Sequence, residues 1–374
     1  MANCSPVDTL SRLRHIQLGA DVADAQTASD LSINLDSSGL EDATNVPILY
    51  TTSRVIQRPR STKLLVVETV PAPVVAGEVR TNPTFKLNVE NLARKLKQLE
   101  PGTSGLLRCY GTVKRRSAQK RLLAIDMIFR TPDECQTTPC TLRQIMMERS
   151  APSITQIVAV AKQVARAVSF FHACDFVHKS IRPENVLIFP PDPDSEPTNN
   201  LGLAFLVGYE QLRHAFFQTE LRGDSAFQRN LYRHPQRQGI RAQERYIMQH
   251  DIYSLGVCLL EMGLWHSFVL YEKGQEQPEL SAALGLEQPQ DETELSNDTS
   301  IALANKDVLV QLAQSQLPQR LGDVYARVVL ACLTCLDPGN QMFGDEASLE
   351  DEDGVLVGVR FIEQILMELD RIYV

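Results

Sequence analysis

The segment Val177–Phe189, with the sequence VHKSIRPENVLIF, contains a polar loop between two apolar runs, and it is the stretch that best indicates the fold of the chain. Before it, apolar residues recur at helical spacing over Ile154–Phe171. Ser153 and Gln156 add a capping box at the start of this helix. After it, the proline-rich, acidic stretch 190–200 is of the kind expected at the tip of a hairpin. The segment therefore connects a long helix to a hairpin.

The chain before this segment divides into a leader and a small strand-rich part. Residues 1–45 are rich in Asp, Ser, Ala and Thr with little apolar periodicity, which predicts a mobile leader; an ordered extension is the alternative. A short β-branched run at 63–70 predicts a strand, and 106–113 and 121–129 predict a strand pair joined by a basic turn. A helix pattern at 85–100 lies between the first strand and this pair.

The chain from about Thr141 onward is mostly helical. Three further stretches have the helical pattern: 250–263, 323–336 and 358–372. A small strand-rich part joined to a larger helical part is an α+β, two-lobed plan. We expect residues 46–130 to form the smaller lobe and residues 131–374 to form the larger one.

Composition excludes several functional classes. With 374 residues and 43% hydrophobic content the chain has enough apolar surface for one or two domains. The net charge of −9 argues against a general nucleic-acid-binding surface, which needs a basic face. No stretch reaches the ~18 apolar residues of a membrane helix, and no signal peptide is evident, so we expect a cytoplasmic protein with no direct membrane segment. Cys332 and Cys335 form the single CxxC and are expected to be buried free thiols, not metal ligands.

The order of four motifs resembles the protein-kinase catalytic domain from about residue 46 to the C-terminus. The motifs are VHKSIRPENVLIF (177–189), FLVGYE (205–210), NLYRHPQRQG (230–239) and HDIYSLGVCLLEMGLW (250–265). The chain is similar to the kinase-like domain of fungal proteins that carry an N-terminal HeLo helical domain, in the group linked to prion-type incompatibility. The resemblance implies a two-lobed kinase fold. Too few residues precede the first strand for a HeLo domain, and we expect that part to be missing.

The stretch 178–185 matches the kinase catalytic loop, H-R-D-x-K-P-x-N, but lacks its acid. Ser180 stands where the aspartate accepts the substrate proton, and a serine hydroxyl has no useful basicity near neutral pH. Arg182 keeps a positive charge at the lysine position, with a planar fork in place of a compact ammonium. Asn185 is retained, either as a magnesium ligand or as a hydrogen-bonding brace of the loop.

The other landmarks of phosphate and metal binding also differ from the kinase pattern. Leu206 stands where an aspartate binds magnesium, and it offers no oxygen ligand. Gly208 is retained, for a backbone conformation that only glycine adopts easily. Val70 takes the position of the strand lysine, and its usual helix partner, Glu90, is expected to face solvent without a partner. A glycine-rich loop cannot form, because no glycine lies between positions 39 and 77.

Residues that match the kinase scaffold are retained. Asp251 matches the helix aspartate that accepts backbone amides of the catalytic loop, and His178 matches the histidine packed beneath that loop. Pro235 and Gln236 stand at the A-P-E motif, and Gln341 stands where an arginine would pair with its glutamate. Kinases have a buried ion pair at these two positions, whereas this chain has a neutral glutamine at each. No charge is therefore left unpaired, and we expect Gln236 and Gln341 to hydrogen-bond.

The absence of the catalytic acid, the metal-binding aspartate, the strand lysine and the glycine-rich loop favours a catalytically inactive kinase-like domain, a pseudokinase that acts as a binding and regulatory module. The resemblance implies a role in fungal incompatibility or cell-death signalling with a protein partner, such as a HeLo-type helical domain. No cofactor or metal is expected. Two alternatives remain: an atypical protein Ser/Thr kinase, and a pseudokinase that binds ATP without magnesium near Met127–Arg130. A cleft between the lobes that is filled by large side chains such as Leu206 would favour a scaffold without nucleotide over a nucleotide-binding pseudokinase.

Overall fold

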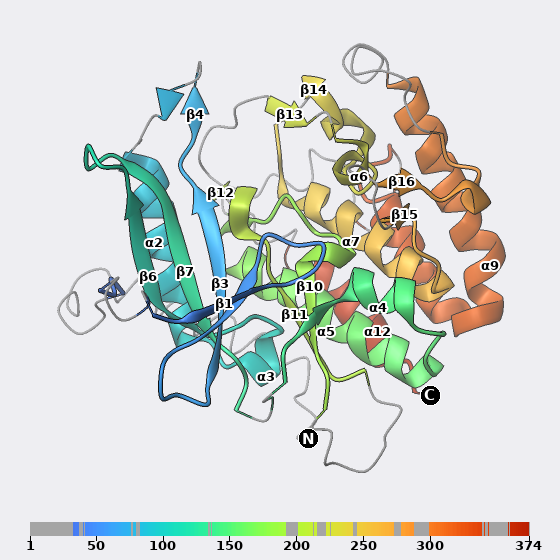
Figure 1. Cartoon of the computed structure of the whole chain (residues 1–374). Helices are drawn as coiled ribbons and strands as arrows, with labels where there is room; N and C mark the ends of the chain where they lie inside the picture. The colour runs from blue at the N-terminus through green and yellow to red at the C-terminus, as the bar shows by residue number, and fades with distance from the viewer. Residues whose placement is uncertain are drawn as a thin grey trace.

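The chain folds into a sheet-rich N-terminal region and a helical C-terminal region, as the α+β prediction requires (Figure 1). The computed structural model describes residues 33–36, 40, 42–75, 78–79, 83–133, 135, 137–191, 201–211, 213–214, 222–224, 226–241, 245–272, 278–287, 299–338, 340, 343, 358 and 360–373. In Figure 1 the sheet, blue to teal, lies on one side and the long helices, green to orange, lie on the other.

Five antiparallel strands form the main sheet, in the order β1-β2-β3-β7-β6. They are β1 (Thr44–Pro47), β2 (Arg54–Gln57), β3 (Leu64–Pro71), β6 (Cys109–Arg116) and β7 (Leu122–Arg130). The strand expected at 63–70 is β3, and its β-branched side chains suit a central strand that is buried on both faces, with Val66 and Val70 in one apolar cluster and Leu65 and Val67 in another. The pair expected at 106–113 and 121–129 is the β6–β7 hairpin. Short β4 (Val74–Val75) and β5 (Glu78–Val79) pair with each other after β3.

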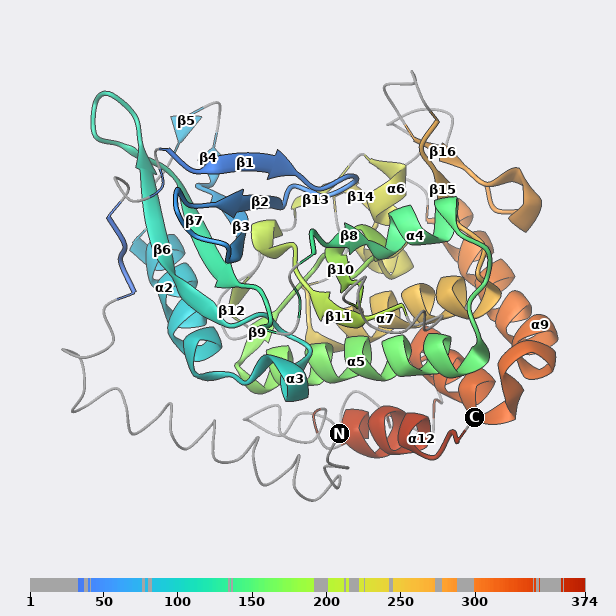
Figure 2. The same cartoon turned by 60° about the horizontal axis from the view of Figure 1, so that its bottom comes forward.

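Helix α2 (Pro83–Gln98) packs on the sheet at β6, and α3 (Pro101–Ser104) follows it. The buried residues of α2 recur at helical spacing: Val89, Leu92, Ala93 and Leu96. Helix α3 ends at Gly105, whose φ of +67° is the left-handed conformation that favours glycine. Figure 2 shows α2 next to β6 and α3 at one end of α5.

Part of the expected leader packs on the sheet. The amide of Thr112 in β6 donates to the carbonyl of Ile33 at 2.6 Å, and the amide of Leu35 donates to the carbonyl of Thr112 at 2.8 Å. Ile33 is buried. This stretch therefore differs from the mobile leader predicted for residues 1–45 and matches the ordered extension. Residues 1–32 lie outside the described part of the chain.

The C-terminal region is built on the long helices α5 (Ile154–Ala173), α7 (Met248–Leu264) and α9 (Ser300–Leu333). Shorter helical segments are α4 (Leu142–Glu148), a π-helix (Ile362–Leu366) and α12 (Met367–Asp370). The Ser153 half of the predicted capping box forms, since the Ser153 hydroxyl accepts from the Gln156 backbone amide at 3.4 Å. Helix α9 contains a break at Gly322, where φ is +83°.

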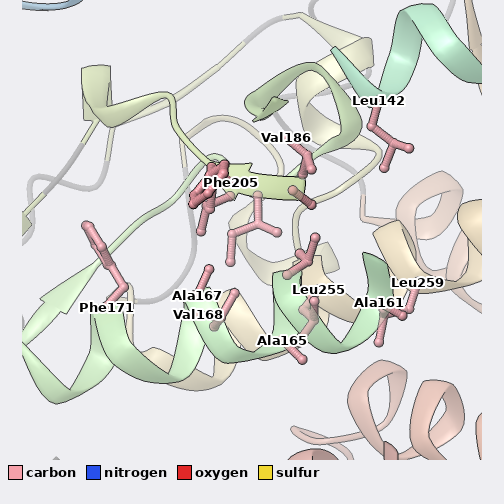
Figure 3. Packing of buried hydrophobic residues seen from close by; sticks show 14 of the residues in the cluster. Leu142, Ala161, Ala165, Ala167, Val168, Phe171, Val186, Phe205, Leu255 and Leu259 are labelled. Carbon is pink, nitrogen blue, oxygen red and sulfur yellow. The ribbon is translucent and has the colours of Figure 1, made fainter. Parts of the chain in front are cut away.

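Helix α5 lies at the centre of the apolar core. Its small residues Ala161 and Ala165 lie against Leu255 and Leu259 of α7, as Figure 3 shows. Of the helices in the described ranges, α5 has the length and composition to cross a membrane, which the sequence analysis did not anticipate. However, 61% of that window is buried inside the protein, as in the core helix of a globular domain.

Short strands and turns connect these helices. The strands are β8 (Cys140–Thr141), β9 (Phe176–Val177), β10 (Val186–Phe189), β11 (Leu203–Leu206), β12 (Arg213–His214), β13 (Arg222–Asp224), β14 (Gly239–Arg241), β15 (Val269–Leu270) and β16 (Glu279–Leu280). The short helices are α6 (Phe227–Asn230) and 3-10 turns at Pro183–Asn185, Tyr209–Gln211, Pro235–Arg237 and Ala282–Leu284. Strands β11, β10 and β8 form one small sheet, so the expected hairpin is β10–β11. The thiols of Cys332 and Cys335 are free and buried, as predicted.

Candidate functional site

The loop 178–185 is held by Asp251 of helix α7. The carboxylate accepts hydrogen bonds from the amides of His178, at 2.7 Å, and Lys179, at 2.9 Å. The His172 ring nitrogen Nε2 lies 3.0 Å from the same carboxylate. Although burial disfavours the charged form, these hydrogen bonds and the neighbouring histidines keep the pKa of the Asp251 carboxyl below its ordinary value. A buried carboxylate with this many donors stabilises the loop conformation.

His178 is a packed core residue. Its ring centre lies 5.2 Å from that of Phe171 and 5.6 Å from that of Tyr209. Its Nδ1 accepts from the Ser180 amide at 3.3 Å. Burial lowers the pKa of His178 to about 4, so the ring is neutral near pH 7. The histidine therefore supports the loop through packing and one hydrogen bond.

Asn185 and Ser180 bond to each other across the loop. The Asn185 amide Nδ2 donates to the Ser180 carbonyl at 2.7 Å and to the Ser180 hydroxyl at 2.8 Å. The Val207 amide donates to the Asn185 carbonyl at 2.8 Å. Gly208 has φ of +92°, and a Cβ there would lie 2.3 Å from the Asn185 side chain. These contacts are those of a loop brace, and they require glycine at position 208.

Leu206 lies inside the apolar core. It ends β11, pairs with Val186, and its side chain is fully buried. Its amide donates to the Gly105 carbonyl at 3.0 Å, which joins the β10–β11 hairpin to the end of α3. Magnesium requires oxygen ligands, and within the described ranges no three His, Cys, Asp or Glu residues gather as a metal site. The residues at this position do not fit a magnesium ion.

Val70 is a core residue of β3, and the charged side chain directed toward Gly208 is Glu68, two residues earlier. Val70 pairs with Ile125 and is buried. Glu68 is also buried, and its Oε2 accepts from the Gly208 amide at 3.1 Å. The hydroxyl of Ser53 donates to the other carboxylate oxygen.

Burial raises the pKa of Glu68 to about 7, even though Ser53 and the backbone amides of Gly208 and Tyr209 stabilise the charged form. This carboxyl therefore changes charge near neutral pH. No motif in the sequence singles out Glu68, because a lone glutamate in a β-branched strand forms none. Its signal was the strand period, which puts it on the same buried face as Val66 and Val70.

The loop between β1 and β2, residues 48–53, is fastened to the helical region. The Thr141 hydroxyl donates to the Leu49 carbonyl at 3.1 Å. The rings of Tyr50 and Tyr271 pack with their centres 4.5 Å apart. Tyr50 has φ of +66°, an uncommon conformation for a non-glycine residue that these contacts stabilise. Protein side chains thus occupy the space between this loop and the start of the C-terminal region.

A second buried polar cluster surrounds Arg143 of α4. Its Nε lies 3.1 Å from Glu184, and its two terminal nitrogens donate to Glu261, Ser267 and Tyr232. The Tyr232 hydroxyl donates to Glu261 at 2.5 Å. The guanidinium is fully buried, so its full set of partners is required. The cluster fastens the segment around Tyr232 to α4 and α7.

The charges of this cluster depend on its arginines. Burial opposes ionisation of Glu184, but Arg143 and Arg182 outweigh it and lower the pKa of the Glu184 carboxyl. Burial dominates at Glu261 and raises the pKa of its carboxyl. Arg182, expected as a cation for phosphate, thus acts on a neighbouring carboxylate of its own loop. The role of Arg143 was not predicted from the sequence, since its partners are distant in the chain.

The prediction for Glu90 is wrong. Its side chain is 10% exposed, and Lys114 of β6 lies 2.9 Å from its carboxylate. Lys86 and Arg94, one helical turn away on either side, lie 3.8 Å and 3.9 Å from it. The pairing with Lys114 arises because α2 packs on β6.

The remaining predicted residues are distributed as follows. Pro235 begins a buried 3-10 turn, with Gln236 partly exposed at its second position. Gln341 lies outside the described residues, so the predicted Gln236–Gln341 hydrogen bond does too. Within Met127–Arg130, Met127 and Phe129 are buried in the core, and Arg130 is exposed at the end of β7.

A comparison with known protein families and a comparison with curated proteins each give no match.

Proposed function

We propose that the chain is a catalytically inactive protein-kinase-like domain, a pseudokinase, that acts as a binding and regulatory module. Glu68 carries the proposal. In a kinase a strand lysine attracts the phosphates of ATP, whereas here the charged side chain that β3 directs toward Gly208 is a carboxylate. A carboxylate at that place repels phosphate when it is ionised.

The catalytic-loop positions add to the argument. Ser180 offers no carboxylate base, and its hydroxyl accepts a hydrogen bond from Asn185. Leu206 is buried in the core and offers no metal ligand. Phosphoryl transfer depends on positioning and charge neutralisation, and none of these side chains supplies either.

The strand order and the motif order support the kinase-like assignment. A five-stranded antiparallel sheet with α2 and α3 between β3 and β6 precedes a helical region in which the loop 178–185 follows α5. Asp251 accepts the amides of His178 and Lys179, which is the bracing role that the resemblance assigns to it. Residues 46–130 and 131–374 are the proposed lobes.

The contacts of residues 48–53 favour the scaffold over the nucleotide-binding alternative. In a kinase the corresponding loop covers the phosphates of ATP. Here the loop is fastened directly to the helical region through Thr141 and Tyr271. A bound nucleotide would have to break these contacts.

The biological setting of the proposal rests on the family resemblance. It implies a cytoplasmic protein in fungal incompatibility or cell-death signalling, whose partner is a protein such as a HeLo-type helical domain. The net charge of −9 is consistent with a partner other than nucleic acid.

Thermal denaturation of the purified chain with and without ATP, each with and without magnesium, tests the proposal. A ligand at a hundred times its dissociation constant adds ~2.7 kcal/mol of stability, so binding would be visible as a shift in melting temperature. Because the proposed domain does not bind nucleotide, we expect no shift in any arm. A kinase that binds ATP serves as the positive control. A shift without magnesium would establish the nucleotide-binding alternative. A shift that requires magnesium, with phosphate transfer to a protein substrate, would establish an atypical kinase.

A further inference from the structure

A groove of about 610 Å³ opens between the N-terminal sheet and the β10–β11 hairpin. Residues of α3, β6, β7 and β11 line it, and Figure 2 shows α3 and β11 near the ends of β6 and β7. Its charged lining residues are Arg58, Lys63, Glu100, Arg108, Arg130 and Asp133. Four cations therefore face two carboxylates, in a chain whose net charge is −9. None of residues 178–185 lines the groove, so its role is independent of the catalytic loop.

Two arginines of the groove share one aromatic ring. The guanidinium of Arg130 lies 4.7 Å from the ring centre of Tyr110, and that of Arg58 lies 5.8 Å from it. They come from different strands, because Arg130 ends β7 and Arg58 follows β2. The negative face of an aromatic ring attracts guanidinium groups, and Tyr110 thereby stabilises two like charges that line the same groove.

In the described part of the chain, no carboxylate within ion-pair distance neutralises these arginines. Asp133 pairs with Lys63 at 3.0 Å, and Arg108 uses its Nε on the Lys97 carbonyl at 3.1 Å. The guanidinium groups of Arg58 and Arg130 make no ion pair there. The pKa of the Asp133 carboxyl is lowered by Lys63 first and by Arg130 to a lesser extent, so this carboxylate offsets part of the positive charge. Two guanidinium forks that make no ion pair among the described residues, in a lining with more cations than carboxylates, are a favourable arrangement for an oxyanion, which can accept two hydrogen bonds from each.

The rest of the lining indicates what carries the oxyanion. Leu64, Leu65, Leu203 and Phe205 add apolar surface beside the arginines. The volume falls within the range of about 300–1,000 Å³ found for sites that bind ligands larger than a single ion. An apolar wall next to an arginine pair suits a phosphorylated peptide, whose flanking side chains would contact the wall.

We propose that this groove binds a phosphorylated segment of a partner protein, with the phosphoryl group between Arg58 and Arg130 and with Arg108 beside it. The site would give the chain a phosphorylation-dependent partner. The proposal stands whether or not the chain has lost phosphoryl transfer, since it uses different residues.

Fluorescence anisotropy with labelled peptides of random flanking sequence tests the site. One set carries a central phosphoserine, phosphothreonine or phosphotyrosine, and its matched set is unphosphorylated. We expect the phosphorylated set to bind at least about tenfold more tightly, because hydrogen bonds to charged groups each contribute about that factor. Equal affinity of both sets, or no binding of either, would overturn the proposal.

Variants test whether the phosphopeptide binds in the groove. Arg58→Ala with Arg130→Ala should weaken binding by about tenfold or more. The matched control, Arg116→Ala with Arg121→Ala, removes two exposed charges at the β6–β7 turn and should leave affinity within about twofold. Arg58→Lys with Arg130→Lys keeps the charge and loses the forks, so it should also weaken binding. An equal effect of groove and control variants would show general charge attraction and overturn the site.

A competition arm separates a peptide from a free phosphate compound as the source of the phosphoryl group. Inorganic phosphate should displace the labelled phosphopeptide only at concentrations far above the peptide dissociation constant. If inorganic phosphate or AMP competes as well as unlabelled phosphopeptide does, the groove binds small phosphate compounds and the peptide assignment is wrong. Competition by AMP would also bear on the ATP experiment above, because the nucleotide-binding alternative lies near Met127–Arg130 and Arg130 lines this groove. A groove that binds phosphopeptide but neither AMP nor ATP leaves the result of the ATP experiment unchanged.

Discussion

The Gly208 amide donates a 3.1 Å hydrogen bond to the carboxylate of Glu68, a residue 140 positions earlier in the chain. This bond connects the central strand of the sheet to the segment that follows β11. The Ser53 hydroxyl donates to the same carboxylate, so the β1–β2 loop is joined to it as well. One buried carboxyl thus links three parts of the molecule, and its protonation state affects all three.

The first prediction concerns the pH dependence that Glu68 creates. Its pKa is about 7 in the folded chain and 4.5 ordinarily, so between these values the folded state holds a proton that the unfolded state has lost. Stability from this proton is complete below pH ~4.5 and is lost as the pH rises through ~7. Glu68→Gln removes this dependence. Relative to wild type, the variant should gain about 3 kcal/mol of unfolding free energy between pH ~5 and ~8.

Urea denaturation of both chains at each pH measures this difference. The buried rings of His178, His234 and His250 have lowered pKa values, so they lower stability as the pH falls. They are common to both chains and cancel in the comparison. Parallel stability profiles for wild type and Glu68→Gln would show that Glu68 does not titrate in this range.

The second prediction concerns the position where a kinase carries its metal-binding aspartate. Leu206 is fully buried, so Leu206→Asp would place an ionisable group in the core and should cost about 3–5 kcal/mol of stability. Leu206→Met, which conserves volume, should cost less than about 1.5 kcal/mol. Urea denaturation with and without magnesium checks both. Restoration of the aspartate variant by magnesium would reveal a metal site that its surroundings do not predict.

The third prediction concerns the brace beneath the loop. Asp251→Ala leaves the amides of His178 and Lys179 without their acceptor and should cost about 3–5 kcal/mol. The half-buried pair of Asp175 with Lys95 offers a control, because Asp175→Asn removes the charge, tolerates the positive φ at this position and should cost only about 0–1 kcal/mol. Chemical denaturation measures both losses. Similar small losses would mean that the loop holds its conformation without Asp251.

The fourth prediction concerns the contact between Tyr50 and Tyr271. A double-mutant cycle with Tyr50→Ala and Tyr271→Ala should give a coupling of about 0.5–1.5 kcal/mol, as expected for an aromatic pair. Tyr271→Phe is the control, since it keeps the ring and loses only the hydrogen bond to Glu184. Additive single effects would indicate that the β1–β2 loop is not fastened at this point in solution.

The elements were more predictable than the contacts between them. Strand β3, the β6–β7 hairpin and helix α5 lie where the periodicity of the sequence put them, because a run of side chains reports its own burial pattern. The exposure of Glu90 was predicted wrongly because it depends on tertiary packing and not on the local pattern of the sequence. Its exposure depends on how α2 lies on β6, and the position of Lys114 on β6 cannot be read from the helix.

By itself, the sequence determined the α+β order of the elements, the capping of α5 and the absence of a carboxylate at positions 180 and 206. These depend on residue type and local spacing. The tertiary structure alone decided which charges meet inside the protein. It joins Glu68 to Gly208 and places Arg143 among two carboxylates. Such contacts join residues far apart in the chain, and they form because a buried charge is stable only where the fold brings it a partner.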